Sequence, residues 1–237
     1  MSNIQDRVER EKKWHDERFN EHARSSKTSK FYQALEYWYI DYDSHFFDAS
    51  SDIVLEVGAG LESVALKAPF NSSLISIDIS STAIDKLKIS EKKGDVVFEL
   101  ADAHKLPYES NKFNLIIGRG ILHHLDLSAA VPELKRVLKQ DGSVVFGEPL
   151  AGNPLINLYR KLTPNLRTPD EQPLRHSDIM FIIDTFPGTK IVYYGFFTLI
   201  SSLLGLKASR FFRRLDDVVL NKFRLGRYLA WACLIHK

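Results

Sequence analysis

The sequence predicts an α/β protein: a doubly wound, mostly parallel seven-stranded sheet with N-terminal helices and an inserted helical cap. Two observations lead to this prediction. From residue 53 onward short apolar runs alternate with segments of helical character, and a marked polar residue follows each run. Alternation at this spacing indicates right-handed βαβ units, whose parallel strands are covered by helices on both faces. The 237 residues, 44% of them hydrophobic, fit one globular domain with added helices.

Composition narrows the class of function. The net charge of +2 is too small to argue for nucleic acid as the main partner. The single cysteine, Cys233, excludes an intramolecular disulfide and a Cys-rich metal site, so we expect no metal and a reducing, cytoplasmic location. Residues 1–13 are charged throughout and do not form a secretory signal. The apolar stretch 191–206 is shorter than the ~20 residues of a membrane span, so stable insertion is not expected.

Residues 1–48 are expected to form a helical extension ahead of the main domain, 49–237. Within the extension, 1–24 has the pattern of a highly charged helix with sparse apolar positions, and we expect much of it to be solvated. The segment 31–47 holds eight aromatic residues. Packing of these aromatics on the main domain is the favoured interpretation. The alternative is a lid in which aromatics such as Tyr32 shape a binding pocket.

In chain order, each apolar run is bounded by turn or capping residues. Ser80, Ser81 and Thr82 offer an N-cap, and Gly94 offers a stop for the same helix. A second capping candidate is Ser177. The predicted strands are 53–57, 74–79, 96–100, 113–118, 143–147, 189–197 and 228–236; the predicted helices between them are 62–68, 80–93, 128–139 and 176–186.

Polar residues stand at the carboxyl ends of the first five predicted strands. Open parallel sheets bind ligands beyond this edge, where the strand order reverses. Random surface charges would not coincide with strand ends in this way. The coincidence predicts a ligand site built from Glu56 and Gly58, Asp78, Asp102, residues 119–124, and Glu148.

The turn Gly58-Ala59-Gly60 lets a ligand press against the backbone, because glycine has no Cβ. Asp78 lies about 20 residues past Gly58, the distance at which a second-strand carboxylate reaches the two hydroxyls of a ribose. Its simpler interpretation is a helix-capping residue. Asp102 is placed to accept a hydrogen bond from an exocyclic amine, with the Ala103 N–H nearby, although a loop aspartate can also form a local turn.

A dinucleotide is the rival ligand, and it would make the chain an NAD-dependent oxidoreductase. Its fingerprint needs a third glycine, where this chain has Ser63. Glu62 also puts a negative charge where a pyrophosphate would approach. Glu56 suits a cationic group instead, such as an ammonium or a sulfonium. The acids therefore favour a sulfonium nucleoside over a dinucleotide.

Residues 53–148 resemble a class I S-adenosylmethionine-dependent methyltransferase of the small-molecule type. The resemblance is carried by Val54 to Gly60, Ser76 to Ser80, Ala101 to Ala103 with Leu106-Pro107-Tyr108, Phe113 to Ile117, Leu122-His123-His124-Leu125, and Leu134 to Gly142. It implies a Rossmann-like sheet, S-adenosylmethionine as cofactor, and a final antiparallel strand pair. It further implies that Glu56, Gly58, Ala59 and Gly60 bind the methionine part, Asp78 with Ile79 the ribose, Asp102 and Ala103 the adenine, and Gly118 with Arg119 the methionine end again. Glu62 departs from the family, which often has another glycine there.

The acceptor predicted for this reaction is a small hydrophobic or specialised metabolite, methylated on oxygen. His123 and His124 follow the fourth strand, and one of them is expected to be the general base; packing or capping is the alternative role for each. Glu148, His176 and Tyr32 are weaker candidates for acceptor contact. Insertions at 149–188 and 203–226 are expected to cap the acceptor site. A module that binds the cofactor without efficient catalysis is the remaining alternative.

Overall fold

A seven-stranded sheet forms the centre of the protein. The computed structural model describes residues 4–20, 33–47, 53–67, 72–91, 94–200 and 209–237. The strand order is β3-β2-β1-β4-β5-β7-β6; β7 is antiparallel to both of its neighbours, and the other pairs are parallel. The strands are β1 Ile53–Val57, β2 Ser73–Asp78, β3 Val96–Leu100, β4 Phe113–Arg119, β5 Leu138–Pro149, β6 Lys190–Tyr194 and β7 Ala232–His236. The predicted sheet is therefore confirmed, including its antiparallel end.

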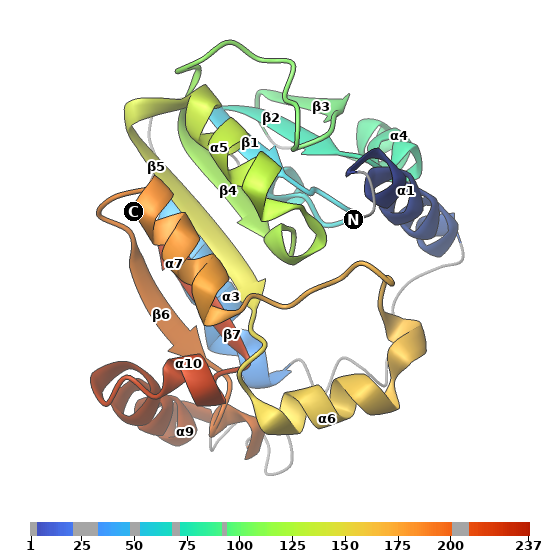
Figure 1. Cartoon of the computed structure of the whole chain (residues 1–237). Helices are drawn as coiled ribbons and strands as arrows, with labels where there is room; N and C mark the ends of the chain where they lie inside the picture. The colour runs from blue at the N-terminus through green and yellow to red at the C-terminus, as the bar shows by residue number, and fades with distance from the viewer. Residues whose placement is uncertain (1–3, 21–32, 48–52, 68–71, 92–93, 201–208) are drawn as a thin grey trace.

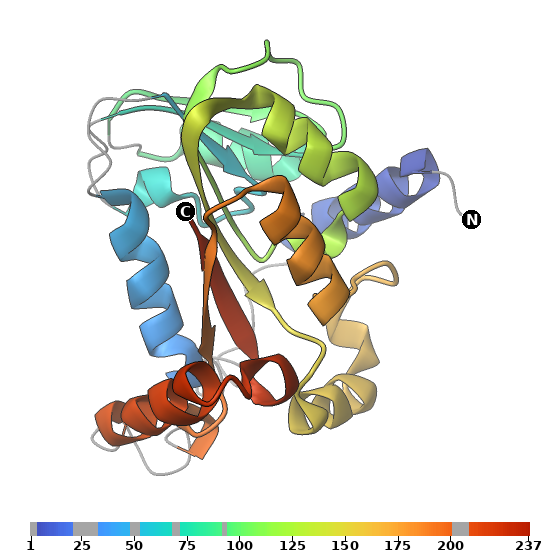
Figure 2. The ribbon, with the colours of Figure 1, turned by 60° about the vertical axis from the view of Figure 1, so that its left-hand side comes forward.

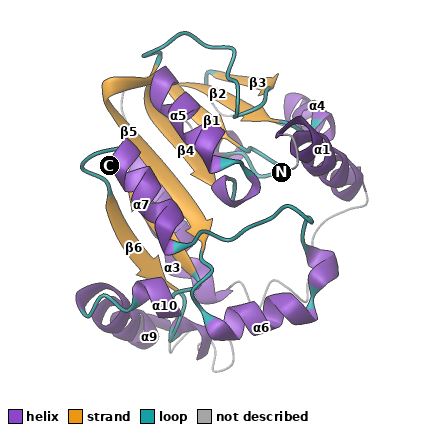
Figure 3. Cartoon of the chain, viewed as in Figure 1, coloured by secondary structure: helices purple, strands orange, loops and turns teal. Residues whose placement is uncertain are grey.

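Helices cover both faces of the sheet (Figures 1 and 3). Helices α5 and α7 lie on one face, and α3 lies on the other, which the turned view shows most clearly (Figure 2). The α-helices are α1 Ile4–Asn20, α3 Glu36–Phe47, α4 Ser81–Ile89, α5 Leu127–Val137, α6 Pro154–Leu162, α7 His176–Thr185, α9 Ser209–Asp216 and α10 Gly226–Leu229. Shorter helices are η1 Gln33–Leu35, η2 Val64–Leu66, η3 Leu122–His124, η4 Pro164–Leu166 and the π-helical η6 Asp217–Lys222.

Alternation along each strand divides the core into two layers. Leu55 and Val57 of β1 pack in the layer that contains α5 and α7, whereas Val54 packs in the layer that contains α3 and α4. Trp38 and Tyr42 of α3 are buried against the second layer, and the Trp38 indole N–H donates to the Cys233 carbonyl at 2.9 Å. The aromatic segment therefore packs on the main domain through Trp38 and Tyr42, and these two residues with Tyr39 also line the cavity described below, so the alternative interpretation as a pocket-shaping lid stays open. Tyr32 lies outside the described residues.

Several predicted boundaries were wrong, each for a local reason. The predicted helix 62–68 is only the short turn η2, because Ser63 and Val64 are held by the Glu56 carboxylate. The sixth strand stops at Tyr194, before Gly195 with its φ of +86°. The seventh begins at Ala232, after α10 has taken residues 226–229. Helix α7 is capped by Arg175 rather than Ser177: the Asp178 side chain accepts from the Arg175 N–H. The Ser80 cap of α4 is confirmed, since its Oγ accepts from the Ala83 N–H at 3.1 Å.

The prediction for the N-terminal helix missed its attachment to the main domain, although only one residue of α1 is buried. Glu11 in α1 is only 3% exposed. Asp16 accepts from the Ser80 hydroxyl at 2.5 Å and from the Thr82 N–H at 3.1 Å, which fixes α1 to the start of α4. The low apolar content of α1 misled the prediction, because this helix is held by polar bonds. Among the described residues no helix is long and apolar enough to cross a membrane.

Candidate functional site

A cavity of about 960 Å³ opens at the carboxyl ends of β1, β2 and β4, where the strand order reverses. Its volume is within the range of small-molecule sites. One end is lined by the turn after β1 and by residues after β2 and β3. The other end is lined by α1, η3 and α6. The cavity therefore joins most of the predicted cofactor residues to a second compartment, formed largely by the N-terminal helix and the inserted cap.

The glycine turn after β1 forms one wall of this cavity. Gly58 and Gly60 have φ of +72° and +52°, a backbone region that favours glycine. A Cβ on Gly58 would also lie 2.7 Å from the Ile121 side chain. The N–H groups of Gly58 and Ala59 both donate to the Ile77 carbonyl, at 2.9 and 3.0 Å. The turn is thus held close to the end of β2, with its backbone facing the cavity.

Two predicted carboxylates stand at the next strand ends. Asp78 accepts from the Gly60 N–H and from the Ser80 N–H, both at 2.8 Å, one with each oxygen. Each oxygen keeps a second lone pair, so the ribose role stays open beside the capping role. Asp102 accepts from the His104 ring and N–H; burial raises the pKa of Asp102, but these bonds lower it overall. Ile79 and Ala103 line the same wall.

Glu56 lies beneath the turn and is 5% exposed. Its carboxylate accepts from the hydroxyls of Ser63 and Ser76, at 2.5 and 2.6 Å, and from the Val64 N–H at 2.9 Å. Burial raises the pKa of this carboxyl group. Glu56 lines the cavity, yet its oxygens already hold the turn together. Its contact with a cationic ligand group therefore stays a prediction.

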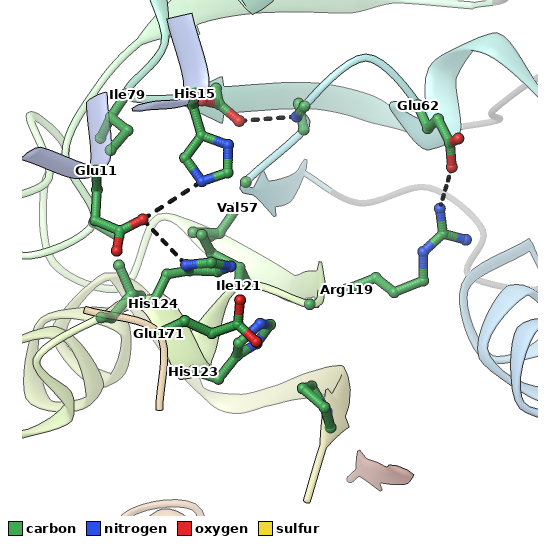
Figure 4. Close-up of a pocket in the computed structure, with 18 of the residues that line it drawn as sticks. Glu11, His15, Val57, Glu62, Ile79, Arg119, Ile121, His123, His124 and Glu171 are labelled. Atoms are coloured by element: carbon green, nitrogen blue, oxygen red, sulfur yellow. Dashed lines mark hydrogen bonds and ion pairs between the residues drawn. The ribbon is translucent and has the colours of Figure 1, made fainter. Parts of the chain in front are cut away.

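Arg119, at the end of β4, extends across the cavity toward Glu62, and their side chains are 3.1 Å apart (Figure 4). Its guanidinium also lies over the Tyr39 ring, 4.9 Å from the centroid. Glu62 is 73% exposed, so this ion pair is a weak link across the mouth of the turn. Gly118 precedes it, where a Cβ would meet Ile121 at 2.7 Å. Gly58 and Gly118 thus leave room for the same isoleucine.

Glu148, at the end of β5, anchors the helical turn η3 from below. It is fully buried and accepts from three backbone N–H groups, those of Ile121, Leu122 and His123, at 3.0, 2.8 and 3.4 Å. Its second oxygen lies 2.8 Å from Nδ1 of His123. Burial raises the pKa of Glu148 to about 7 and lowers the pKa of His123 to about 3. His123 is therefore neutral at pH 7, and Glu148 positions it.

His124 is bonded to the N-terminal helix (Figure 4). Its Nδ1 lies 3.1 Å from Glu11 Oε2, and the same oxygen lies 3.5 Å from Nε2 of His15. The Thr168 hydroxyl donates to the other oxygen of Glu11 at 2.5 Å. Burial alone would raise the pKa of Glu11, but these bonds lower it far below its usual range. Helix α1 thus closes one side of the cavity and places the buried Glu11 carboxylate beside His124, one of the two predicted bases.

Glu11, His15 and His124 bring ligand-type atoms within 4.8 Å of one another, as do His123, His124 and Glu171. The Glu11 oxygens are already occupied by hydrogen bonds from His15, His124 and Thr168. These hydrogen bonds account for the closeness of Glu11, His15 and His124.

The structure separates two of the weaker candidates from the cavity. His176 is exposed and lines a smaller pocket of about 210 Å³ beside Gly152 and Arg227. Glu148 lies under η3 and acts through it. The sequence analysis missed Glu11, His15, Tyr159, Arg160 and Glu171, which all line the cavity. Glu11 and His15 had a signal, because their i, i+4 spacing puts them on one helix face.

A family model described as a methyltransferase domain matches residues 55–146. The chain is 29% identical over 146 residues to YcgJ, an uncharacterised methyltransferase of Bacillus subtilis (strain 168), covering 59% of this chain and 57% of that protein. It is 28% identical over 179 residues to a demethylmenaquinone methyltransferase of Lactobacillus johnsonii, covering 67% and 73%. The chain covers 57%, 44% and 36% of the lengths of three curated relatives.

Solved structures show the same fold. A geranyl diphosphate C-methyltransferase from Streptomyces coelicolor A3(2), in complex with Mg²⁺, geranyl diphosphate and S-adenosyl-L-homocysteine, superposes with a TM-score of 0.56 at 13% identity. The match covers 86% of this chain and 79% of that one. The chain thus shares its fold with a methyltransferase of known structure, and residues 55–146 match the methyltransferase domain.

Proposed function

We propose that this protein transfers a methyl group from S-adenosylmethionine to a hydroxyl of a small, largely apolar acceptor. The observation that carries the proposal is that one cavity joins the Gly58–Gly60 turn and the carboxylates of Asp78 and Asp102 to the buried His123 and the half-buried His124. A methyl donor bound over the turn would lie beside the compartment that holds the histidines. Similarity to a demethylmenaquinone methyltransferase in sequence, and to a geranyl diphosphate C-methyltransferase in fold, supports a small-molecule acceptor.

Residues of the cofactor end fit the donor. The ribose hydroxyls would donate to the free lone pairs of Asp78, and the adenine amine would donate to Asp102. The glycine turn leaves the space that the methionine part needs. Ala59, Ile79, Ala103 and Gly118 with Arg119 would complete this end. S-adenosylmethionine supplies an already activated methyl group, so the residues of this chain need only align the acceptor and remove its proton.

Of the two histidines, we assign the general base to His124. Burial gives His123 a pKa of about 3, which makes it a weak proton acceptor. His124 is half-buried, and its carboxylate partner Glu11 favours the protonated form that a base becomes. A Glu11 bond to Nδ1 orients the ring and leaves Nε2 for the acceptor. The His123 ring packs against His124, with centroids 4.2 Å apart, and supports its position.

The proposal is tested by incubating the protein with methyl-labelled S-adenosylmethionine and metabolite extracts, followed by mass identification of labelled products. A labelled ether or ester supports it. Label on carbon would keep the methyl transfer but overturn the assignment to oxygen. Calorimetry with S-adenosylhomocysteine and NAD tests the cofactor separately: tighter binding of NAD would overturn the proposal.

Asp78→Ala should weaken binding of S-adenosylhomocysteine about 100-fold or more. Two ribose hydroxyls would lose a charged acceptor, each bond contributing about 1.5–3 kcal/mol. Asp85→Ala, at an exposed position of α4, is the matched control and should bind normally. Calorimetry measures both. Unchanged affinity in a folded Asp78→Ala variant would contradict the ribose assignment.

The pH dependence should follow from the lowered pKa of His124. Burial is the main cause of the lowering, followed by the neighbouring His123; Glu11 opposes it, and His15 and Glu171 also lie near the ring. A base acts when it is neutral, which is the case above its pKa. The rate kcat/KM should therefore be full at pH 7 and fall only below the ordinary histidine value of 6.5. A midpoint above pH 6.5 in the measured profile would contradict the assignment.

A further inference from the structure

We propose that the exposed face of residues 154–166 and 209–229 docks the protein on the surface of an anionic phospholipid bilayer. This docking face comprises α6 with η4, and α9, η6 and α10. The two parts adjoin: the Asn153 side chain, at the start of α6, donates to the Leu229 carbonyl at 2.5 Å. Figures 1 and 2 both show α6, α10 and α9 along the same end of the molecule.

The first observation is an apolar stripe on the outside of α6. Leu155, Leu158 and Leu162 are 60%, 56% and 73% exposed, and their spacing puts them along one side of the helix. Ile156, on the opposite side, is buried and lines the cavity. A helix that packs only on a protein core would present polar residues outward. Helix α6 instead has apolar residues on both sides, which is typical of a helix that contacts a second apolar phase.

The second observation is the same arrangement on the adjoining segment. Phe211, Phe223 and Tyr228 are 61%, 64% and 53% exposed. Aromatic side chains at this exposure suit the headgroup level of a bilayer, where one part of the ring is apolar and the other is wet. Together with the leucines they form an exposed apolar set at one end of the molecule.

The third observation is charge. The two segments contain eight lysines and arginines against two acids, although the whole chain has a net charge of only +2. Of the two acids, Asp216 is buried and Asp217 pairs with Arg213. Six of the remaining cations are exposed and form no ion pair with the described residues: Lys161, Arg210, Arg214, Lys222, Arg224 and Arg227. Cations beside apolar side chains complement an anionic membrane surface.

Nucleic acid is the other anionic surface, and the leucines argue against it. Phosphate backbones are bound by basic residues, with aromatics stacking on bases, and an exposed aliphatic stripe has no role in that contact. An anionic bilayer can contact the leucines, the aromatic residues and the cations of this face at the same time. Docking would also place the cap helix α6, whose inner side lines the cavity, at the membrane surface.

The test is partitioning of the whole chain onto vesicles, measured by flotation at low and high salt. We expect binding to phosphatidylcholine vesicles that contain phosphatidylglycerol, and much weaker binding to phosphatidylcholine alone. Arg214→Glu and Lys222→Glu should each lower the partition coefficient at least roughly fivefold. The triple change Leu155→Ser, Leu158→Ser and Leu162→Ser should lower it roughly tenfold or more.

Matched controls lie on α4. Ile89 is 87% exposed and Lys88 is exposed beside it, so Ile89→Ser and Lys88→Glu remove the same kinds of group at another place and should leave partitioning unchanged. The assay needs neither donor nor acceptor, so its result is independent of the proposed reaction. Equal losses in the control variants, or no partitioning at low salt, would overturn the proposal. Two other outcomes would also overturn it. In one, the parent protein does not bind vesicles and forms a dimer that the leucine variant loses. In the other, the protein binds labelled RNA and not vesicles.

Discussion

Replacing Glu148 with alanine should lower the free energy of unfolding by about 3–5 kcal/mol, because three N–H groups at the start of η3, two of them buried, lose their common acceptor. His123 loses its partner in the same change. The variant no longer has to bury a carboxyl group, but this gain offsets only part of the loss. Backbone donors at the start of a helical turn have no other acceptor there. Urea unfolding of the purified variant measures the effect.

Glu148→Gln separates the hydrogen bonds from the charge. Its amide oxygen can still accept from Ile121 and Leu122, so we expect a smaller loss than for alanine. Glu109→Ala, at an exposed position, should change stability by less than about 0.5 kcal/mol. If Glu148→Ala unfolded at the same urea concentration as Glu109→Ala, the anchoring role of Glu148 would be wrong.

The sequence was sufficient for the parts of the site that depend on neighbours along the chain. The run Ile53 to Val57 is apolar because β1 is buried, and the glycines after it are needed for positive φ and for close contact with Ile121. Asp78 and Asp102 follow strands, so parallel pairing alone brings them to one edge. These predictions needed only strand periodicity and the rule that parallel strands end together.

The acceptor end depends on contacts between distant parts of the chain, and the sequence pattern does not encode them. Glu11 meets His124 across 113 positions and Thr168 across 157. Charged residues on a helix with few apolar positions are usually solvated, and the i, i+4 spacing of Glu11 and His15 indicates a shared helix face without indicating that Glu11 is buried. Glu148 was predicted to approach the acceptor, but its bonds go to the backbone of η3. A polar residue at a strand end indicates that a site is near, but it does not indicate whether the side chain faces the ligand or supports the residues that do.

His124→Ala should lower kcat/KM for the acceptor about 10²- to 10⁴-fold, the usual contribution of a general base. Binding of S-adenosylhomocysteine should stay close to that of the parent, because the ring lies at the acceptor end of the cavity. This separation distinguishes a lost base from a collapsed site. The measurement is steady-state kinetics with the acceptor identified by labelling, alongside calorimetry with the cofactor product.

Glu11→Gln tests whether the base depends on the N-terminal helix. An amide keeps the shape of the carboxylate but removes the charge that favours protonated His124, so the pKa of His124 should fall further. The acidic limb of the pH profile should then move to lower pH and the maximal rate should decrease, as expected for a weaker base. His45→Ala, on the outer end of α3, is the control histidine and should leave both unchanged. If His124→Ala kept full turnover, the base would have to be another residue. If His124→Ala lost activity but Glu11→Gln had no effect, α1 would cover the cavity without changing the pKa of His124.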